Sequence, residues 1–192
     1  MARPREFDPD DVVACAMDLF WDSGYHGSSY QALEAATGLN RSSLYNAFGG
    51  KQELFCRALD AYRDGPCREL HRPLREQRGY EAIEAYLEQL ATFVRSRLAS
   101  RGCLMLNTSL EEPVDDQVDE RVTNHFSLLR KALRRAYSEG LVDHTVNPDL
   151  TAKRASDWLV TTVRGVLAAA AGGESTSAVI NTIEIARAHL RP

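Results

Sequence analysis

Apolar residues recur at three- and four-residue intervals along nearly the whole chain, and alternation of β-branched and polar residues is never sustained. This spacing places apolar side chains on one face of an α-helix and does not fit the two-residue period of a strand. The pattern therefore predicts an all-α protein of about nine helices.

The first two helices have clear start signals. Asp8-Pro9 is expected to open the first, because aspartate caps unpaired N–H groups and proline needs no donor at the first helical position. Gly24 is expected to end it. Ser28, followed three residues later by Gln31, forms a capping box for a short second helix.

A glycine turn separates the second helix from a third of similar length. Gly38 lies at the bend, Asn40 can cap the third helix, and this helix is expected to end near Phe48. Gly49-Gly50 then breaks the pattern, and Lys51 begins a fourth helix. Two short helices joined by a glycine turn and braced by a preceding helix are typical of a helix-turn-helix.

The later part of the chain has longer periodic segments, which are typical of helical bundles. Helices are expected at residues 80–99, 103–111, 114–138, 149–171 and 175–189. We therefore predict two domains: a three-helix helix-turn-helix domain over residues 1–55, and a helical-bundle regulatory and dimerisation domain over residues 56–192.

The third helix has one apolar face and one polar face. Leu44 and Phe48 lie four residues apart and can anchor it to the core. The opposite surface carries side chains that suit guanine, adenine or phosphate oxygens, namely Arg41, Ser42, Tyr45 and Asn46. A merely solvated face would favour Glu and Lys, which are better helix formers than Ser, Asn and Tyr.

The segment "GLNRSSLYNAFGGKQELF", with "GYHGSSYQALEAATGL" before it, closely resembles the DNA-binding region of the TetR family of bacterial transcriptional regulators. The turn glycine, the L-Y-x-x-F sequence and the following lysine occur at the family's spacing, and the match covers about residues 10–60. The resemblance implies DNA contacts by Ser28, Gln31, Arg41, Ser42, Ser43, Tyr45, Asn46 and Lys51.

The resemblance also implies a role for each contact. Ser28 is expected to cap the second helix beside a phosphate, and Gln31 and Arg41 to approach bases. Tyr45 and Lys51 are expected to hold phosphates, and the remaining three contacts to lie in the groove. The position of Lys51 at a helix N-terminus agrees, because backbone N–H groups there favour an anion.

Two positions depart from the family's pattern. Glu34 stands where a small residue usually packs between the two helices, and Ala47 stands where several members carry histidine or tyrosine. The sequence preference of other members therefore does not transfer to this chain. Arg3 and Arg5 precede the first helix and can add backbone or minor-groove contacts.

Composition and charge set broad limits. The hydrophobic content of 44% suits a globular core, and no apolar run is long enough to span a bilayer. The net charge of -4 arises in residues 1–55, which hold four basic and eight acidic side chains, so DNA binding must come from local geometry. With no signal peptide and no metal-ligand spacing, we expect a cytoplasmic protein without metal or cofactor.

The last two long helices carry more apolar surface than a single layer requires, and the "LAAAAGG" segment permits close helix approach. In the TetR family, helices in this position pair across a two-fold axis. We therefore expect a homodimer that reads an inverted-repeat operator, since two recognition helices about 34–36 Å apart supply the contacts that one lacks.

Two regulatory sites are predicted. Cys103 lies at a helix N-terminus near Arg101, which would lower its thiol pKa and suit it to sensing an electrophile or oxidant; a buried structural thiol is the alternative. An unknown small-molecule effector is expected in a pocket whose lining mixes apolar walls and a few polar groups: Tyr86, Phe93, Met105, Asn107, Phe126, Trp158 and Thr162. At helical spacing the same residues would also suit a plain core.

The sequence thus predicts a TetR-like regulator, most simply a repressor released from DNA by a small molecule or by thiol modification. An enzyme on a helical bundle is the first alternative, although the five histidines are isolated and no nucleophile elbow or phosphate loop is present. A helical adaptor that uses the helix-turn-helix for protein contacts is the second.

Overall fold

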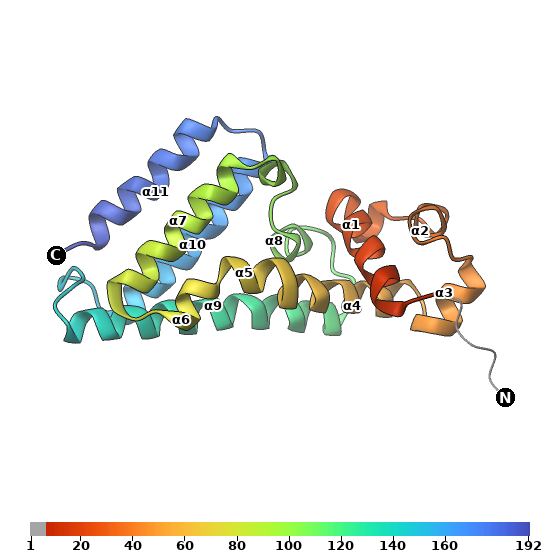
Figure 1. Cartoon of the computed structure of the whole chain (residues 1–192), viewed down its shortest axis with the longest axis horizontal. Coiled ribbons are helices and arrows are strands. Elements are labelled where there is room, and N and C mark those ends of the chain that lie inside the picture. Colours follow the sequence, from red (N-terminus) through yellow and green to blue (C-terminus); the bar gives the residue numbers. More distant parts are fainter. Residues whose placement is uncertain (1–6) are drawn as a thin grey trace.

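A computed structural model describes residues 7–192, and this part of the chain is helical, without strands. Figure 1 shows an elongated molecule with a small group of helices at one end and a bundle of longer helices at the other. The first group comprises α1 (Pro9–Gly27), α2 (Tyr30–Thr37), α3 (Arg41–Phe48) and the start of α4 (Lys51–Tyr62).

The predicted signals at the ends of α1 are present in the structure. Asp8 caps the helix, and its carboxylate accepts a hydrogen bond from the Asp10 N–H at 2.9 Å. Gly24 has φ 69° and ψ 176°, a conformation that breaks the helix before its last turn. Only glycine adopts that region readily, so the sequence position of the kink is fixed by this residue.

The turn between α2 and α3 also follows the prediction. Gly38 is left-handed with φ 71°, and the Asn40 side chain accepts a hydrogen bond from the Ser43 N–H at 2.8 Å. Leu33 of α2 and Leu44 of α3 are buried against α1 and α4 in a continuous apolar core. The three-helix N-terminal domain is therefore confirmed.

The fourth helix does not end at the predicted domain boundary. The cut between residues 55 and 56 falls inside α4, which leads directly into a π-helical turn at Arg63–Cys67 and a short helix α5 (Arg68–Leu70). Pro66 lies within this turn, where its missing N–H accounts for the local change in hydrogen-bond pattern. The same helical segment thus belongs to both ends of the molecule.

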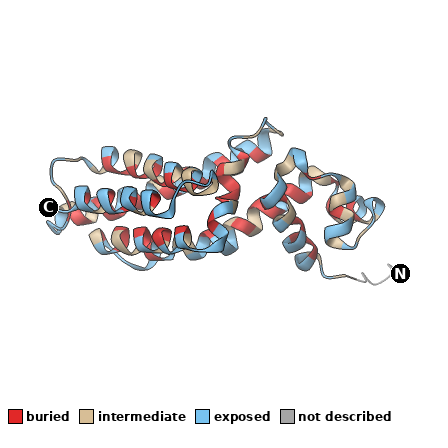
Figure 2. Cartoon of the chain, turned by 90° about the horizontal axis from the view of Figure 1, so that it is seen from above, coloured by how far each residue is buried: buried red, intermediate tan, exposed pale blue. Residues whose placement is uncertain are grey.

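The bundle contains the predicted long helices with shifted ends. The helix expected to reach residue 99 stops at Arg95 and is followed by a 3-10 turn, while the helix expected from residue 114 begins after its cap, Asp115. The remaining elements are α6 (Arg72–Glu76), α7 (Gly79–Arg95), the 3-10 turn (Arg97–Arg101), α8 (Leu104–Thr108), α9 (Asp116–Val142), α10 (Ala152–Ala171) and α11 (Thr176–Leu190). Figure 2 shows their buried faces turned inward along the bundle.

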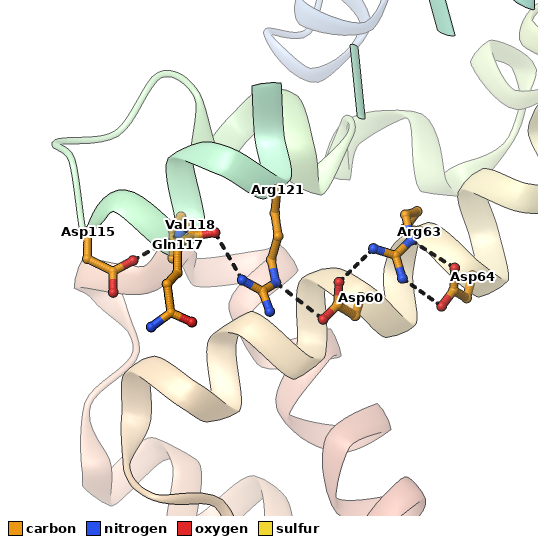
Figure 3. Close-up of polar contacts among 7 residues, drawn as sticks. All are labelled: Asp60, Arg63, Asp64, Asp115, Gln117, Val118 and Arg121. Atoms are coloured by element: carbon orange, nitrogen blue, oxygen red, sulfur yellow. Dashed lines mark hydrogen bonds and ion pairs between the residues drawn. The ribbon is translucent and has the colours of Figure 1, made fainter. Parts of the chain in front are cut away.

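A polar network joins α4 to the start of α9. Arg121 of α9 donates to the Asp60 carboxylate at 3.2 Å, and Arg63 donates to the other oxygen of Asp60 at 2.7 Å (Figure 3). Arg63 also pairs with Asp64, which holds the pKa of that carboxyl below its usual value through a direct hydrogen bond. The network ties the DNA-binding end to the longest helix of the bundle.

Within the described residues, no helix combines the length and apolar character needed to cross a bilayer.

Candidate DNA-binding surface and regulatory cavity

The recognition helix α3 presents the surface that its pattern predicts. Leu44 and Phe48 are buried with 1% and 4% exposure, which fixes the helix against the core. The opposite side is exposed and carries the four predicted polar side chains, Arg41, Ser42, Tyr45 and Asn46. Tyr45 has 64% of its surface exposed although it is a large aromatic residue, so the fold itself does not use its ring.

Glu34 ties the two short helices together. Its carboxylate accepts a hydrogen bond from the Arg41 N–H, the first of α3, at 2.5 Å. A negative charge at a helix N-terminus is favourable, because the first N–H groups have no partner within the helix. The departure from the small residue usual at this position therefore supplies a second cap to the recognition helix, beside Asn40.

The capping role predicted for Ser28 is wrong. Ser28 is fully buried, and its hydroxyl donates to the Gly24 carbonyl at 2.6 Å. The cap of α2 is its neighbour Ser29, whose exposed hydroxyl accepts from the Ala32 N–H at 3.1 Å. Gln31, three residues after Ser28, made Ser28 the stronger candidate, but packing at the preceding kink turns Ser28 inward and leaves Ser29 at the cap position.

Tyr30 organises the edge of this surface and was missed in the sequence. Its hydroxyl accepts a hydrogen bond from the Lys51 N–H at 3.2 Å, and the Arg41 guanidinium lies 4.3 Å above its ring. The Lys51 ammonium lies 4.3 Å from the ring of Tyr25, and partial burial lowers the pKa of Lys51 below its usual value. The sequence signal that could have indicated this role was an aromatic residue directly after the cap of α2.

The other predicted contacts vary in their exposure. Gln31 is exposed on the first turn of α2, while Ser43 and Ala47 are half-buried along α3. Arg3 and Arg5 lie outside the described residues. The structure thus brings the exposed polar groups of α2, α3 and the start of α4 onto one face of the small domain.

A cavity of about 440 Å³ opens inside the bundle. Three of the seven predicted pocket residues line it: Tyr86, Phe93 and Phe126. The other four do not. Met105 is packed in the core, the Asn107 amide donates to the Arg101 carbonyl, and Trp158 lies against His189. Thr162 lies outside the lining, to which α10 contributes Val163 and Leu167. Helical spacing alone could not distinguish these faces.

Cys103 lies in the wall of the same cavity. Cys103 is buried at the N-cap position of α8, and its polar neighbours include the Cys67 thiol, the His125 ring and the Tyr62 hydroxyl. A hydrogen bond from the Cys67 thiol holds the pKa of Cys103 well below its usual value, and His125 adds to the effect through a hydrogen bond and its charge. The predicted contribution of Arg101 is wrong, because its guanidinium turns away toward α1.

Comparison with known proteins matches this geometry. The sequence profile of the family described as "Bacterial regulatory proteins, tetR family" matches residues 12–58. The HTH-type transcriptional regulator YezE of Bacillus subtilis is 29% identical over 143 residues, which is 74% of this chain and 72% of that protein. The HTH-type transcriptional repressor ComR of Escherichia coli is 27% identical over 177 residues, 90% of this chain and 84% of its own.

A solved structure extends the likeness over both domains. A cysteine variant of the TetR family regulator CifR, complexed with a 26-base-pair double-strand operator DNA, superposes with a TM-score of 0.87 at 26% identity and covers 98% of this chain and 100% of its own. The chain belongs to the TetR family. It is a TetR-like transcriptional regulator, which confirms the prediction and sets aside the bundle enzyme.

In this TetR-family protein, Arg101 connects the cavity wall to the DNA-binding domain. Its guanidinium pairs with Asp18 at 3.1 Å and Asp22 at 2.6 Å, and it lies 4.2 Å above the Trp21 ring. The Trp21 indole N–H in turn donates to the carbonyls of Arg101 and Gly102 at 3.1 and 3.2 Å. Arg101, from the bundle, thereby balances the charges of two α1 carboxylates, those of Asp18 and Asp22.

Glu111 makes a second connection on the other side of α8. Its carboxylate accepts from the Tyr25 N–H at 2.9 Å, next to the kink at Gly24. The segment from Arg101 to Glu111 therefore contacts α1 at both of its ends, and Cys103 lies between them. The segment thus links the cavity wall to the helix that braces the recognition helix.

Proposed function

We propose that this TetR-family protein is a cytoplasmic repressor that binds an inverted-repeat operator as a homodimer and leaves it when an effector enters the bundle cavity. The exposed polar stripe of α3, with Tyr45 64% exposed, is the observation that carries the proposal. A fold that buries Leu44 and Phe48 while leaving a tyrosine outside has a surface ready for a partner. Relatives whose names describe repressors, such as ComR, support repression over activation of transcription.

The proposed DNA contacts are those of the predicted set, with Ser29 in the place of Ser28. Arg41 and Asn46 suit base edges in a major groove. An arginine can donate to O6 and N7 of guanine, and an asparagine can accept from N6 and donate to N7 of adenine. Tyr45 and Lys51 suit phosphates that flank the groove. The full set is Ser29, Gln31, Arg41, Ser42, Ser43, Tyr45, Asn46 and Lys51.

The proposed division assigns DNA binding to residues 1–55 and sensing and dimerisation to residues 56–192, with the boundary inside α4, which belongs to both. For the dimer we assign the outer faces of α10 and α11. Ile185 is 60% exposed there, and Gly165 has no neighbouring atom within 4 Å of an added Cβ, so a second helix can approach closely. The symmetric pairing places two recognition helices on one face of the duplex.

Release requires only that an effector prefer the conformation that does not bind DNA. The cavity wall continues into the Arg101–Glu111 segment, which holds α1 at Trp21 and Tyr25. An effector in the cavity, or a group added to the Cys103 thiol through it, would displace this segment. The distance between the two recognition helices would then change.

DNA binding is tested by fluorescence anisotropy with the protein's own promoter region over a range of salt concentrations. Lys51→Ala and Tyr45→Phe are each expected to weaken binding by about 10- to 150-fold, since a hydrogen bond to a charged group is worth about 1.5–3 kcal/mol. Lys51→Ala should also lower the salt slope by about 1. Lys131→Ala, which removes an exposed charge on α9, is the matched control and should leave binding unchanged.

Equal affinity of all three variants and the parent protein would contradict the DNA-binding role and favour an adaptor.

The effector step is tested separately with an electrophile. Cys103→Ser is expected to abolish electrophile-induced release from DNA while Cys15→Ser, at an exposed cysteine on α1, does not. Unchanged release by Cys103→Ser would exclude this thiol as the sensor.

A further inference from the structure

Three potential metal ligands meet beside the bundle cavity, although they are far apart in the sequence. The Sγ atoms of Cys67 and Cys103 and a ring nitrogen of His125 all lie within 4.8 Å of one another. Cys67 ends the π-helical turn after α4, Cys103 caps α8, and His125 lies in α9. Three separate elements therefore contribute one ligand each, and no spacing motif could reveal the cluster.

The side chains have the chemistry that thiophilic ions select. Thiolate sulfur is the preferred ligand of Zn²⁺ and Cu⁺, and imidazole suits both ions. Zinc bonds of about 2.3 Å to sulfur and about 2.0–2.1 Å to nitrogen place ligand atoms roughly 3.5–3.8 Å apart. From separations of up to 4.8 Å, the three atoms need to approach by about 1.3 Å at most, which is within the range of small side-chain rotations.

Burial and charge strengthen the fit. All three residues are buried, with exposures of 3%, 4% and 5% for Cys67, Cys103 and His125. A buried charge is costly unless it is balanced, and two thiolates with a neutral imidazole balance a doubly charged ion. The charge count therefore favours Zn²⁺ over Cu⁺, which would leave one negative charge uncompensated.

The surrounding space provides access and a further coordination position. Cavities of about 440 and 450 Å³ share Cys67, His71 and His125 in their linings, so the ligand cluster can be reached from either space. Tyr86 lines the cavity of about 440 Å³ around Cys103, and its hydroxyl is fully buried and has no hydrogen-bond partner among the described residues. A buried hydroxyl without a partner fits a site that holds a ligand or its bound water.

We propose that Cys67, Cys103 and His125 form a binding site for one thiophilic metal ion, Zn²⁺ by preference, with an open fourth position toward the cavity. Three protein ligands with an open fourth position are typical of catalytic zinc sites, whereas structural sites supply four ligands. His71 stacks on His125 with 5.4 Å between ring centroids and holds its plane.

The placement of the ligands gives the ion a regulatory role, and this part rests on the proposed function. Cys67 belongs to the helical segment that begins at Lys51, and Cys103 follows the Arg101–Gly102 segment that binds Trp21. Drawing both sulfurs onto one ion pulls the α8 segment toward the end of α4. The ion would thus favour one arrangement of the DNA-binding domain over another.

Binding is tested first without DNA. Metal-free protein, kept anaerobic with a phosphine reductant, is titrated with Co²⁺, whose thiolate charge-transfer absorption reports sulfur ligation. Zn²⁺ is then added in competition with a chromogenic chelator, and Cu⁺ in competition with bicinchoninate. We expect one ion per chain, loss of the charge-transfer absorption in Cys67→Ser and Cys103→Ser, and affinity for Zn²⁺ lowered by more than about 100-fold, beyond the loss typical of outer-sphere changes.

Cys15→Ser is the matched control, because Cys15 is exposed on α1 away from the cluster, and it should bind like the parent protein. If a cluster variant does not fold, the parent protein still provides a test: Zn²⁺ should slow alkylation of Cys67 and Cys103 but not of Cys15, as measured by peptide mass spectrometry. Absence of sulfur ligation, or alkylation that Zn²⁺ does not change, overturns the site.

The regulatory role is measured by operator anisotropy with and without the ion. A change in DNA affinity that disappears in Cys103→Ser supports it. Binding of Zn²⁺ with unchanged DNA affinity keeps the site and overturns its regulatory role. Binding of Zn²⁺ by a protein that ignores DNA in both states keeps the site and overturns the proposed function instead.

Discussion

The kink at Gly24 is held against Glu111, and replacing the glycine should expose the strength of that contact. A Cβ built at Gly24 lies 2.6 Å from Glu111 Oε1, which cannot remain in place. The same carboxylate accepts the Tyr25 N–H at 2.9 Å, so its displacement removes this hydrogen bond. Gly24→Ala therefore disturbs the backbone and the interdomain contact together.

The two costs can be assigned from the geometry. The backbone at φ 69°, ψ 176° is essentially restricted to glycine, which gives about 1–3 kcal/mol for alanine. A part-buried N–H that loses its acceptor costs about 1–3 kcal/mol more. Gly24→Ala should thus lower the free energy of unfolding by about 2–6 kcal/mol.

A double-mutant cycle in urea separates these costs. Glu111→Ala removes the carboxylate beforehand, so Gly24→Ala in that background should carry only the backbone cost. The double variant should be about 1–3 kcal/mol less destabilised than the sum of the single variants, because the lost hydrogen bond is counted in both. Equal costs of Gly24→Ala in the two backgrounds would refute the proposed role of Glu111.

Gly38→Ala is the matched control for backbone strain. Gly38 is left-handed with φ 71°, and nothing lies within 4 Å of an added Cβ. Gly38→Ala should lower the free energy of unfolding by about 1–2 kcal/mol and show no coupling to Glu111→Ala. Coupling of similar size at Gly38 would indicate that Glu111 acts through the whole small domain instead of through the kink.

Three further predictions concern other parts of the molecule. Glu34→Ala should lower the free energy of unfolding by about 0.5–2 kcal/mol through loss of the α3 cap, while Glu34→Gln keeps an acceptor and should cost less; equal losses in urea titrations would contradict the capping role. Tyr86→Phe should leave stability unchanged or raise it by about 1 kcal/mol, because the hydroxyl lacks a partner; a loss above about 2 kcal/mol would reveal one. Ile185→Glu should shift sedimentation toward the monomer and weaken operator binding, and an intact dimer would move the interface elsewhere.

The helices and the recognition surface could be predicted because their causes are local. The 3.6-residue period, the caps at Asp8 and Asn40, and the glycines at positions 24 and 38 act within one or two turns of the chain. The anchoring of α3 by Leu44 and Phe48 follows from the same period. Helix ends were predicted less accurately. The helix expected to reach residue 99 ends at Arg95, because the last turn of a helix is readily replaced by a 3-10 turn.

The errors occurred where a distant part of the chain decides the outcome. The capping-box signal with Gln31 favoured Ser28, but Ser28 is buried with its hydroxyl bonded to the Gly24 carbonyl, and Ser29 caps the helix instead. Arg101 is two residues from Cys103, yet its guanidinium binds Asp18 and Asp22 because α1 brings two carboxylates within reach. Sequence proximity did not determine the electrostatic environment in either case.

By itself, the sequence determined that this chain folds into helices and that its third helix offers polar groups to a partner, since both depend on neighbouring residues. Only the tertiary structure decided what surrounds Cys103. Cys67 and His125 reach it from an unexpected π-helical turn and from the middle of α9, and burial by the bundle brings their polar atoms together. Contacts between elements depend on helix crossing and packing, which the periodic pattern of one segment does not contain.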